Sequence, residues 1–402
     1  MLNKSFFQKT LIFLAIIAIF IAAFIIYKPT QSPVSQEAKN IESGIWNLEN
    51  QKPKPNITYT TLFFAGDIML SRNVHDKMNK ANDFTLPFKN TTNEISSADI
   101  AVANLESPFN NNGAHFIEGS LVFNADPKSI EGLKFTGFDI LSLANNHSLD
   151  QGLAGLDFTL EHLINNGIIP TGVTNSKKET IDPVIEKNKL VFGFLSYSYT
   201  GLNDGGKTAS PYVNDFNDID KMKSDIIRMK GHTADIVIVS MHAGVEYTRT
   251  PNEKQIKFAH AAIDAGADFV IGHHPHWIQT IEHYTPSPLT PLPGGEGQDE
   301  KKHEGWIFYS LGNFVFDQMW STDTREGLTV FLTYGTADNH PALDAGSNQE
   351  QIPAFAGMEI KKIELKPVII DNFCCPRWAN ENETKGILKK INLTSPVVLD
   401  KN

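Results

Sequence analysis

Short apolar runs alternate with amphipathic stretches along most of the chain after Thr58. Runs rich in β-branched and aromatic residues predict buried strands, namely YTTLFFAG, ADIAVANLE, FDILSLANN, KLVFGFLSYS, ADIVIVSMHAG, ADFVIGHH and GWIFYSLGN. Between them, segments 153–168 and 250–268 carry apolar residues at helical spacing. For the second segment we expect Thr250 as the N-cap and Gly266 as the stop. Strands that alternate with helices indicate an α/β fold, in which ligand groups gather at the carboxyl ends of the strands.

The pattern changes at the N-terminus. Residues 1–30 contain the uncharged run TLIFLAIIAIFIAAFIIY between Lys9 and Lys28. About 18 residues at 1.5 Å rise give roughly 27 Å of helix, close to the thickness of a bilayer core. We predict an uncleaved signal-anchor transmembrane helix with its N-terminus in the cytoplasm and the rest of the chain exported. A cleaved signal peptide is the alternative.

The remaining boundaries follow from composition. Residues 31–57 are polar and proline-bearing, which predicts a flexible linker. The folded domain is expected over 58–375, interrupted by two irregular segments at 285–304 and 336–358 that we interpret as surface-loop insertions. Residues 376–402 are expected to form a C-terminal tail. Cys374 and Cys375 are adjacent, and we expect two thiols there because vicinal disulfides are rare.

Charge excludes one class of partner. The net charge is -11, so the chain has no excess of basic residues with which to bind nucleic acid over a broad surface.

Polar side chains that can bind a metal follow the predicted strands. Carboxylate, amide and imidazole groups come directly after five of these apolar runs, where an ordinary turn needs only Gly, Asn, Asp or Ser. Such groups suit one or two divalent cations, although the identity of the metal (Mn, Zn, Fe or Mg) stays open. The candidates are Asp67, Asn104, Glu106, Asn145, Asn146, His147, His242, His273, His274 and His276.

Several segments resemble the signature motifs of the CapA capsule-synthesis family, which is associated with poly-γ-glutamate and related to calcineurin-like metallophosphatases. They are FAGDIMLSR, ADIAVANLESP, LANNHSLDQG, MHAGVEY, IGHHPHWIQ and YSLGNFVFDQ, in this order. The resemblance implies a metallophosphatase-like α/β/β/α sandwich. It also implies metal ligands at Asp67, Glu106, Asn146, His242, His274 and His276, with Glu106 in place of the usual bridging aspartate.

The same resemblance assigns the residues around the metal. His147 would be the acid that protonates the leaving group, and His273 would support the ligands through a hydrogen bond. Apart from the resemblance, the position of Arg72 five residues after Asp67 leads us to expect that it binds a carboxylate or phosphate, and we expect Glu246, Tyr247 and Asn313 to border the substrate. The family pattern is broken at Met69, which stands where metallophosphatases have a histidine, and at Ala243, where an aromatic residue is common.

These features lead to one functional expectation. We expect a membrane-anchored, extracytoplasmic, metal-dependent hydrolase that acts on an anionic cell-surface polymer during synthesis, export or attachment of poly-γ-glutamate or capsule. Its expected partners are the polymer, the membrane and membrane synthase or export subunits. A cell-surface metallophosphatase or nucleotidase, and a non-enzymatic accessory subunit of a polymer-export complex, are the alternatives.

Overall fold

The computed structural model describes residues 56–199, 210–232, 234–286, 303–337 and 358–401. The predicted transmembrane helix and most of the predicted linker lie outside these residues, as do most of the two predicted insertions. Within the described ranges, no helix is both long and apolar enough to cross a membrane.

The first sheet is built around β1. Parallel strands β2, β3 and β4 lie on one side of β1, and antiparallel β12, β13 and β14 lie on the other, while β11 pairs with β1 and β15 with β13. Its strands are β1 (Ile57–Ile68), β2 (Ile100–Leu105), β3 (Ile140–Ser142), β4 (Ile169–Thr171), β11 (Asn313–Val315), β12 (Glu326–Ala337), β13 (Met358–Asp371), β14 (Cys375–Trp378) and β15 (Val397–Asp400).

The second sheet has the order β5-β6-β7-β8-β10-β9, with a parallel centre and antiparallel outer pairs. Its strands are β5 (Val184–Lys187), β6 (Leu190–Ser198), β7 (Ile236–His242), β8 (Phe269–His273), β9 (Ile281–Tyr284) and β10 (Gly305–Phe308).

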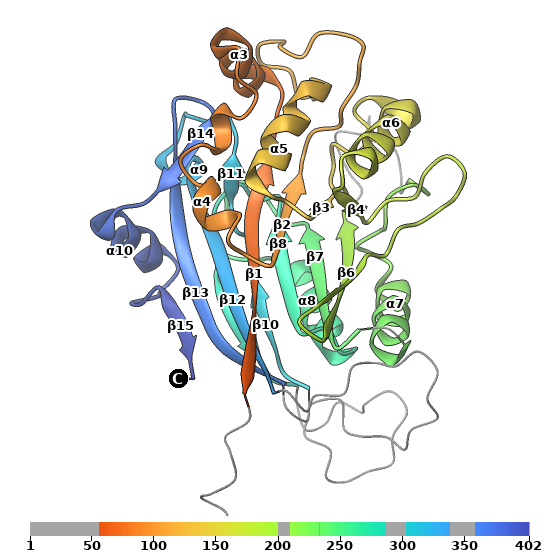
Figure 1. The fold of residues 1–402 in the computed structure, drawn as a ribbon, viewed down its shortest axis with the longest axis vertical. Coiled ribbons are helices and arrows are strands. Elements are labelled where there is room, and N and C mark those ends of the chain that lie inside the picture. The colour runs from red at the N-terminus through yellow and green to blue at the C-terminus, as the bar shows by residue number, and fades with distance from the viewer. Residues whose placement is uncertain (1–55, 200–209, 233, 287–302, 338–357, 402) are drawn as a thin grey trace, which may run out of the picture. The chain divides into compact units, whose positions relative to one another are not determined.

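The two sheets face each other, and helices cover their outer faces (Figure 1). Alternate side chains of β1, such as Leu62 and Phe64, pack against Phe194 and Ile238 of the second sheet, because successive residues of a strand point to opposite faces. The helices are α3 (Arg72–Ala81), α4 (Thr92–Ile95), α5 (Ile130–Thr136), α6 (Gly152–Asn165), α7 (Ile219–His232), α8 (Glu253–Asp264), α9 (Thr322–Arg325) and α10 (Glu381–Lys390), with short 3-10 helices η1 (Leu86–Phe88) and η2 (Pro127–Ser129). The predicted α/β class is confirmed.

Two local expectations need correction. The N-cap of α8 is Asn252 rather than Thr250, since the Asn252 side chain accepts a hydrogen bond from Gln255 N and the Gln255 side chain accepts one from Asn252 N. Cys374 and Cys375 form a disulfide in the turn between β13 and β14 rather than two thiols.

The segment that we predicted as a C-terminal tail carries regular structure. It contains most of β14, the helix α10 and the strand β15, which extends the first sheet by pairing with β13.

Candidate metal centre

The predicted ligands lie at the carboxyl ends of strands from both sheets. Asp67 is near the end of β1, Glu106 follows β2, and Asn146 and His147 follow β3. His242 ends β7 in the second sheet, and the loop after β8 carries His274 and His276. Residues that are far apart in the sequence therefore meet where the two sheets face each other.

A glycine allows β1 to approach the backbone just before β11 closely. A Cβ atom at Gly66 would lie 1.9 Å from the carbonyl oxygen of Gly312, so only glycine fits there. The next residue, Asp67, donates its backbone N–H to the same oxygen at 3.0 Å. The backbone thus fixes where the Asp67 carboxylate enters the site.

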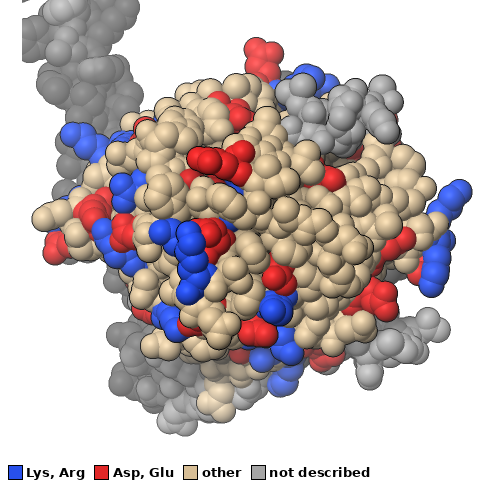
Figure 2. Space-filling model, turned by 90° about the horizontal axis from the view of Figure 1, so that it is seen from above, with Lys and Arg blue, Asp and Glu red and all other residues tan. Residues whose placement is uncertain are grey.

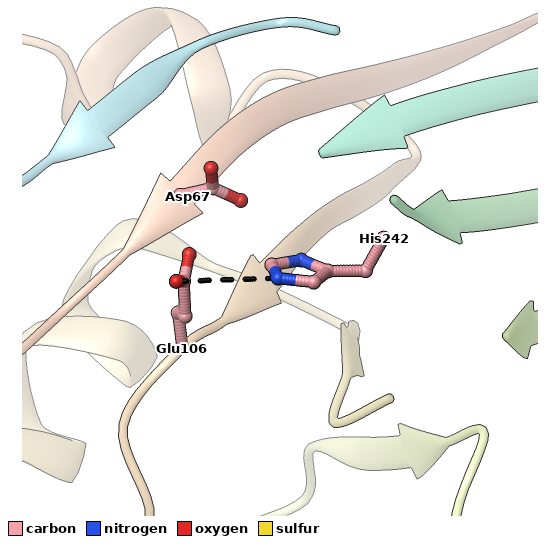
Figure 3. Close-up of side chains that lie close together, drawn as sticks. All are labelled: Asp67, Glu106 and His242. Carbon is pink, nitrogen blue, oxygen red and sulfur yellow. Dashed lines mark ion pairs between the residues drawn. The ribbon is translucent and has the colours of Figure 1, made fainter. Parts of the chain in front are cut away.

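Asp67, Glu106 and His242 form the centre of the site. One ligand atom from each of the three side chains lies within 4.8 Å of the others, and all three side chains are buried (Figure 3). Two carboxylates and an imidazole at this spacing can hold a divalent cation.

Glu106 lacks hydrogen bonds. Neither carboxylate oxygen accepts one from any described residue, and the side chain is 0% exposed. The Nε2 atoms of three imidazoles lie near its Oε1, at 3.7 Å for His147, 3.8 Å for His276 and 4.0 Å for His242. Burial, reinforced by the charge of Asp67, raises the pKa of Glu106 well above its ordinary value.

Unlike Glu106, Asp67 accepts hydrogen bonds at both of its carboxylate oxygens. Its Oδ1 accepts a hydrogen bond from Asn104 Nδ2 at 2.8 Å, and its Oδ2 accepts one from the His274 backbone N–H at 3.3 Å. Burial opposes ionisation, but the imidazoles of His273 and His276 hold the pKa of Asp67 well below its ordinary value. His273 Nδ1 lies 3.4 Å from Asp67 Oδ1 without a hydrogen bond to any described residue, so its predicted supporting role stays a prediction.

His242 is held between two amides. Its Nε2 lies 2.8 Å from Asn146 Oδ1, and its Nδ1 lies 3.3 Å from Asn104 Nδ2. Burial, together with the neighbouring His274, lowers the pKa of His242 well below its ordinary value, so the ring is neutral. A neutral imidazole and an amide oxygen side by side are both suitable metal ligands.

The loop after β8 turns sharply to present its histidines. Both His274 and His276 have positive φ angles, 94° and 55°, a conformation that non-glycine residues adopt only where the surroundings impose it. The ring of His274 lies 4.9 Å from that of His242. Burial, then the charge of His276, lowers the pKa of His274 to about 3.

Asn313 determines the orientation of His276. Its Nδ2 donates to the backbone carbonyl of Thr324 at 2.9 Å, so its Oδ1 must be the atom that accepts from His276 Nδ1, also at 2.9 Å. The Nε2 atom of His276 is thereby left to face Glu106. Asn313, which we predicted to border the substrate, is fully buried behind His276.

His147 is held by an acid and an aromatic ring. Its Nδ1 lies 2.7 Å from Asp150 Oδ2, and its ring stacks on Phe123 with centroids 3.8 Å apart. Burial lowers the pKa of His147, while Asp150 opposes that shift.

The predicted substrate contacts lie around this centre. Arg72 forms an ion pair with Asp317 and lies over the ring of Phe123, with its Cζ 4.7 Å from the centroid. Tyr247 stacks near His276 with centroids 6.0 Å apart, and burial raises its pKa to about 12, with the charge of exposed Glu246 adding to the shift. An anion at Arg72 would therefore share the guanidinium with Asp317.

Three residues that shape the site had no assigned role in the sequence interpretation. Asn104, Asp150 and Asp317 contact Asp67, His147 and Arg72, respectively. Asn104 and Asp150 lie inside the motifs ANLESP and NNHSLDQG, and Asp317 follows SLGNFVF. Their positions next to the candidate ligands were the available signal.

The residues present fit a divalent cation. The strongest indication is Glu106, because a fully buried carboxylate without a hydrogen-bond partner is costly unless a cation or proton compensates it. The donor set of carboxylate, imidazole and amide contains no thiolate, which leaves the identity of the metal undetermined.

Comparison with known proteins identifies the family. The model of the family described as Bacterial capsule synthesis protein PGA_cap matches residues 61–318. The chain belongs to this capsule synthesis family. The predicted CapA resemblance is thus confirmed, and every candidate metal ligand of this PGA_cap member lies inside the matched region.

Named relatives agree with this assignment. The PGA biosynthesis protein CapA of Bacillus subtilis is 31% identical over 296 residues, covering 71% of this chain and 71% of that protein. The capsule biosynthesis protein CapA of Bacillus anthracis is 29% identical over 296 residues, covering 70% of this chain and 65% of that protein, just under two thirds of its length. A third relative, from Mycobacterium tuberculosis, is described as a "Probable polyglutamine synthesis accessory protein" and is 26% identical over 208 residues, covering 49% and 54% of the two chains.

Solved structures are less similar to this PGA_cap protein. A phosphatase from Mycoplasma pneumoniae has a TM-score of 0.43 at 14% identity, covering 82% of this chain and 98% of that one. The NAD nucleotidase of Haemophilus influenzae has a TM-score of 0.40 at 10% identity, covering 86% and 57%. Both likenesses are too low to support a statement about function.

Proposed function

We propose that this protein is a metal-dependent hydrolase that acts on an anionic cell-surface polymer during the synthesis, export or attachment of poly-γ-glutamate or capsule. Family membership and the printed names of the two Bacillus relatives support the pathway. The observation that carries the chemistry is Glu106, whose buried oxygens accept no hydrogen bond from the described residues, while its Oε1 faces three imidazoles.

The chain's own residues would perform distinct tasks in this reaction. Glu106, Asn146 and His276 would hold the cation, with Asp67, His242 and His274 beside them, since His242 accepts from Asn104 at Nδ1 and donates to Asn146 Oδ1 from Nε2. When bound, a divalent cation supplies a Lewis acid and lowers the pKa of a bound water. Arg72 would orient an anionic group of the substrate through a bidentate contact.

His147 would transfer the proton to the leaving group. Asp150 holds its Nδ1 side, so the Nε2 side faces the cluster. An anionic substrate beside the ring would raise the lowered pKa of His147 and favour the protonated form that an acid needs. Stacking on Phe123 keeps the ring in this orientation.

The cellular setting is part of the proposal. The apolar run within residues 1–30 supports a single N-terminal anchor with the domain on the outer side of a bacterial membrane. Figure 2 looks down from the side to which β1 points in Figure 1, and positive and negative side chains are interspersed over a largely uncharged surface. A polyanion would therefore bind locally, near the cluster and Arg72, with membrane synthase or export subunits as further partners.

The test is hydrolysis by the metal-loaded, full-length protein. We expect cleavage of a phosphoester or of a γ-glutamyl amide bond, and we expect His147→Ala to lower kcat by about 10²–10⁴-fold while bound metal stays unchanged. His260→Ala is the matched control, because His260 pairs with Glu282 away from the cluster. Absence of turnover, or full activity in His147→Ala, would refute the proposal.

One observation favours a second candidate function, a non-enzymatic accessory role. Met69 stands where the family resemblance led us to look for a histidine, and its sulfur accepts hydrogen bonds from the backbone and hydroxyl of Ser71 at 3.2 and 3.1 Å. The Mycobacterium relative's printed description also names an accessory protein. Normal polymer production by a His147→Ala strain, with membrane partners co-purifying, would favour this alternative.

A further inference from the structure

Asn104 occupies the middle of the cluster. It lies at the end of β2, is 0% exposed, and its Nδ2 reaches both Asp67 Oδ1 at 2.8 Å and His242 Nδ1 at 3.3 Å. An amide nitrogen with two hydrogens can donate to both atoms at once.

Neighbouring groups fix the orientation of this amide. Asn145 Nδ2 donates to the Leu105 carbonyl at 2.8 Å, and Asn145 Oδ1 accepts from the His147 backbone N–H at 3.1 Å. Asn145 Nδ2 therefore also faces Asn104 Oδ1, at 3.2 Å, which turns Asn104 Nδ2 toward Asp67 and His242. Asn104 presents N–H groups to both side chains, and N–H groups cannot bind a cation.

Asp67 and Glu106 consequently differ as ligands. Both oxygens of Asp67 accept hydrogen bonds from N–H groups of the protein, from Asn104 and from the His274 backbone. Both oxygens of Glu106 accept none from the described residues. Glu106 is thus the carboxylate that has its lone pairs available.

Charge sets the number of cations. Two-metal hydrolytic sites hold their ions about 3.5–4 Å apart, and anionic ligands must offset the repulsion between them. Asp67 and Glu106 are the carboxylates of this cluster, and the group between Asp67 and His242 is the neutral amide of Asn104.

We propose that the cluster binds one divalent cation rather than two, with Glu106 as its main carboxylate ligand, and that Asn104 excludes a second cation by presenting N–H groups to Asp67 and His242. This inference rests on the metal-dependent function proposed above. Asn104 is a positioning residue, and Glu106 rather than Asp67 provides most of the affinity.

The experiment measures binding of Mn²⁺ to the full-length protein by calorimetry, metal analysis and electron paramagnetic resonance. Wild type is expected to bind one Mn²⁺ per chain and to give the six-line spectrum of an isolated ion. Glu106→Gln should weaken binding at least 100-fold, whereas Asp67→Asn should keep one equivalent with about tenfold weaker binding. Asn104→Asp should admit a second Mn²⁺, with a spectrum broadened by coupling between the ions.

Two controls keep the result interpretable. Asn104→Ala removes the N–H groups without adding charge and should still bind one Mn²⁺, and Asn214→Asp places a carboxylate at another buried asparagine, which bonds to Ser196 instead of the cluster. Circular dichroism confirms folding of each variant. Two Mn²⁺ per wild-type chain, or binding that survives Glu106→Gln and is lost in Asp67→Asn, would overturn the inference. One bound Mn²⁺ without hydrolysis would refute the proposed enzyme and leave this inference standing.

Discussion

Two imidazoles of the centre have one nitrogen held by a neighbour, and that neighbour decides which nitrogen faces Glu106. His147 contacts Asp150 through Nδ1, and His276 contacts Asn313 through Nδ1. In both rings Nε2 is then directed at Glu106, at 3.7 and 3.8 Å. For His276, the tautomer needed for binding a cation is thus set before the cation arrives, and for His147 the same arrangement directs Nε2 into the site for proton transfer.

Removing one such neighbour should weaken metal binding. In Asn313→Ala, His276 loses its Nδ1 acceptor and the Thr324 carbonyl loses its donor. We expect divalent-metal affinity to fall about 10–100-fold and the free energy of unfolding to fall by about 1–3 kcal/mol. Titration calorimetry and urea denaturation measure the two effects. Asn214→Ala should lower stability alone, and equal metal affinity in both variants would contradict the role assigned to Asn313.

At the residue scale, the sequence predicted which side chains gather but not how they pair. Asp67, Glu106 and His242 each follow an apolar run, and strand ends meet at one edge of a sheet, so their proximity was predictable. The contact between Asn104 and His242 joins different sheets, and the placement of Asn313 behind His276 joins separate loops. Such contacts depend on the packing of the whole molecule, which strand patterns alone do not specify.

Among the elements, α10 is one that the sequence pattern concealed. Its buried residues are Ile387 and Leu388, too few to give a clear helical stripe. Its start is well defined, because the Asn380 side chain accepts from the backbone N–H groups of Asn382 and Glu383. Glu383 in turn accepts from Asn380 N and forms a two-contact ion pair with Arg377.

This cap should give stability that depends on pH. Hydrogen bonds from Arg377 lower the pKa of Glu383 to about 2. A depressed pKa in the folded state adds stability above the ordinary carboxylate range, near 4.5, and that stability is lost as pH falls toward 2. Glu383→Gln should therefore reduce the free energy of unfolding by about 1 kcal/mol at pH 7 and by progressively less below pH 4.5. Urea denaturation across this range measures the difference, and a penalty independent of pH would contradict it.

For the whole molecule, the relative position of the two sheets matters most. The first sheet supplies Asp67 and Glu106, and the second supplies His242 and the histidine loop. The apolar layer between the sheets, which includes Phe64 and Phe194, sets the distance between these groups. The α/β class followed from the sequence pattern, whereas the register that aligns the two strand edges came only from the structure.

A cavity in that layer should affect both folding and metal binding. Phe64→Ala removes a buried ring three residues before Asp67, and we expect a loss of about 3–5 kcal/mol in the free energy of unfolding. Metal affinity should also fall, because the distance between the two sheets, and so between their ligands, is no longer fixed by the ring. Ile226→Ala, in helix α7 of the outer layer, should cost about 2–5 kcal/mol without changing metal affinity. Unchanged affinity in Phe64→Ala would show that the layer does not set the site.

The last helix is also linked to the histidine loop. Lys390 of α10 forms ion pairs with Asp323 and Glu326. Arg249 forms ion pairs with the same two acids. Arg249 also donates a hydrogen bond to the carbonyl of Ile278, which follows the histidines of the loop after β8. Among the described residues, a protein shortened before residue 380 would leave Arg249 as the one remaining ion-pair partner of the two acids, and it would open the edge of β13 that pairs with β15. Deleting this end would thus disturb the histidine loop and promote aggregation together, so loss of metal binding in a truncated protein would say little about the cluster itself.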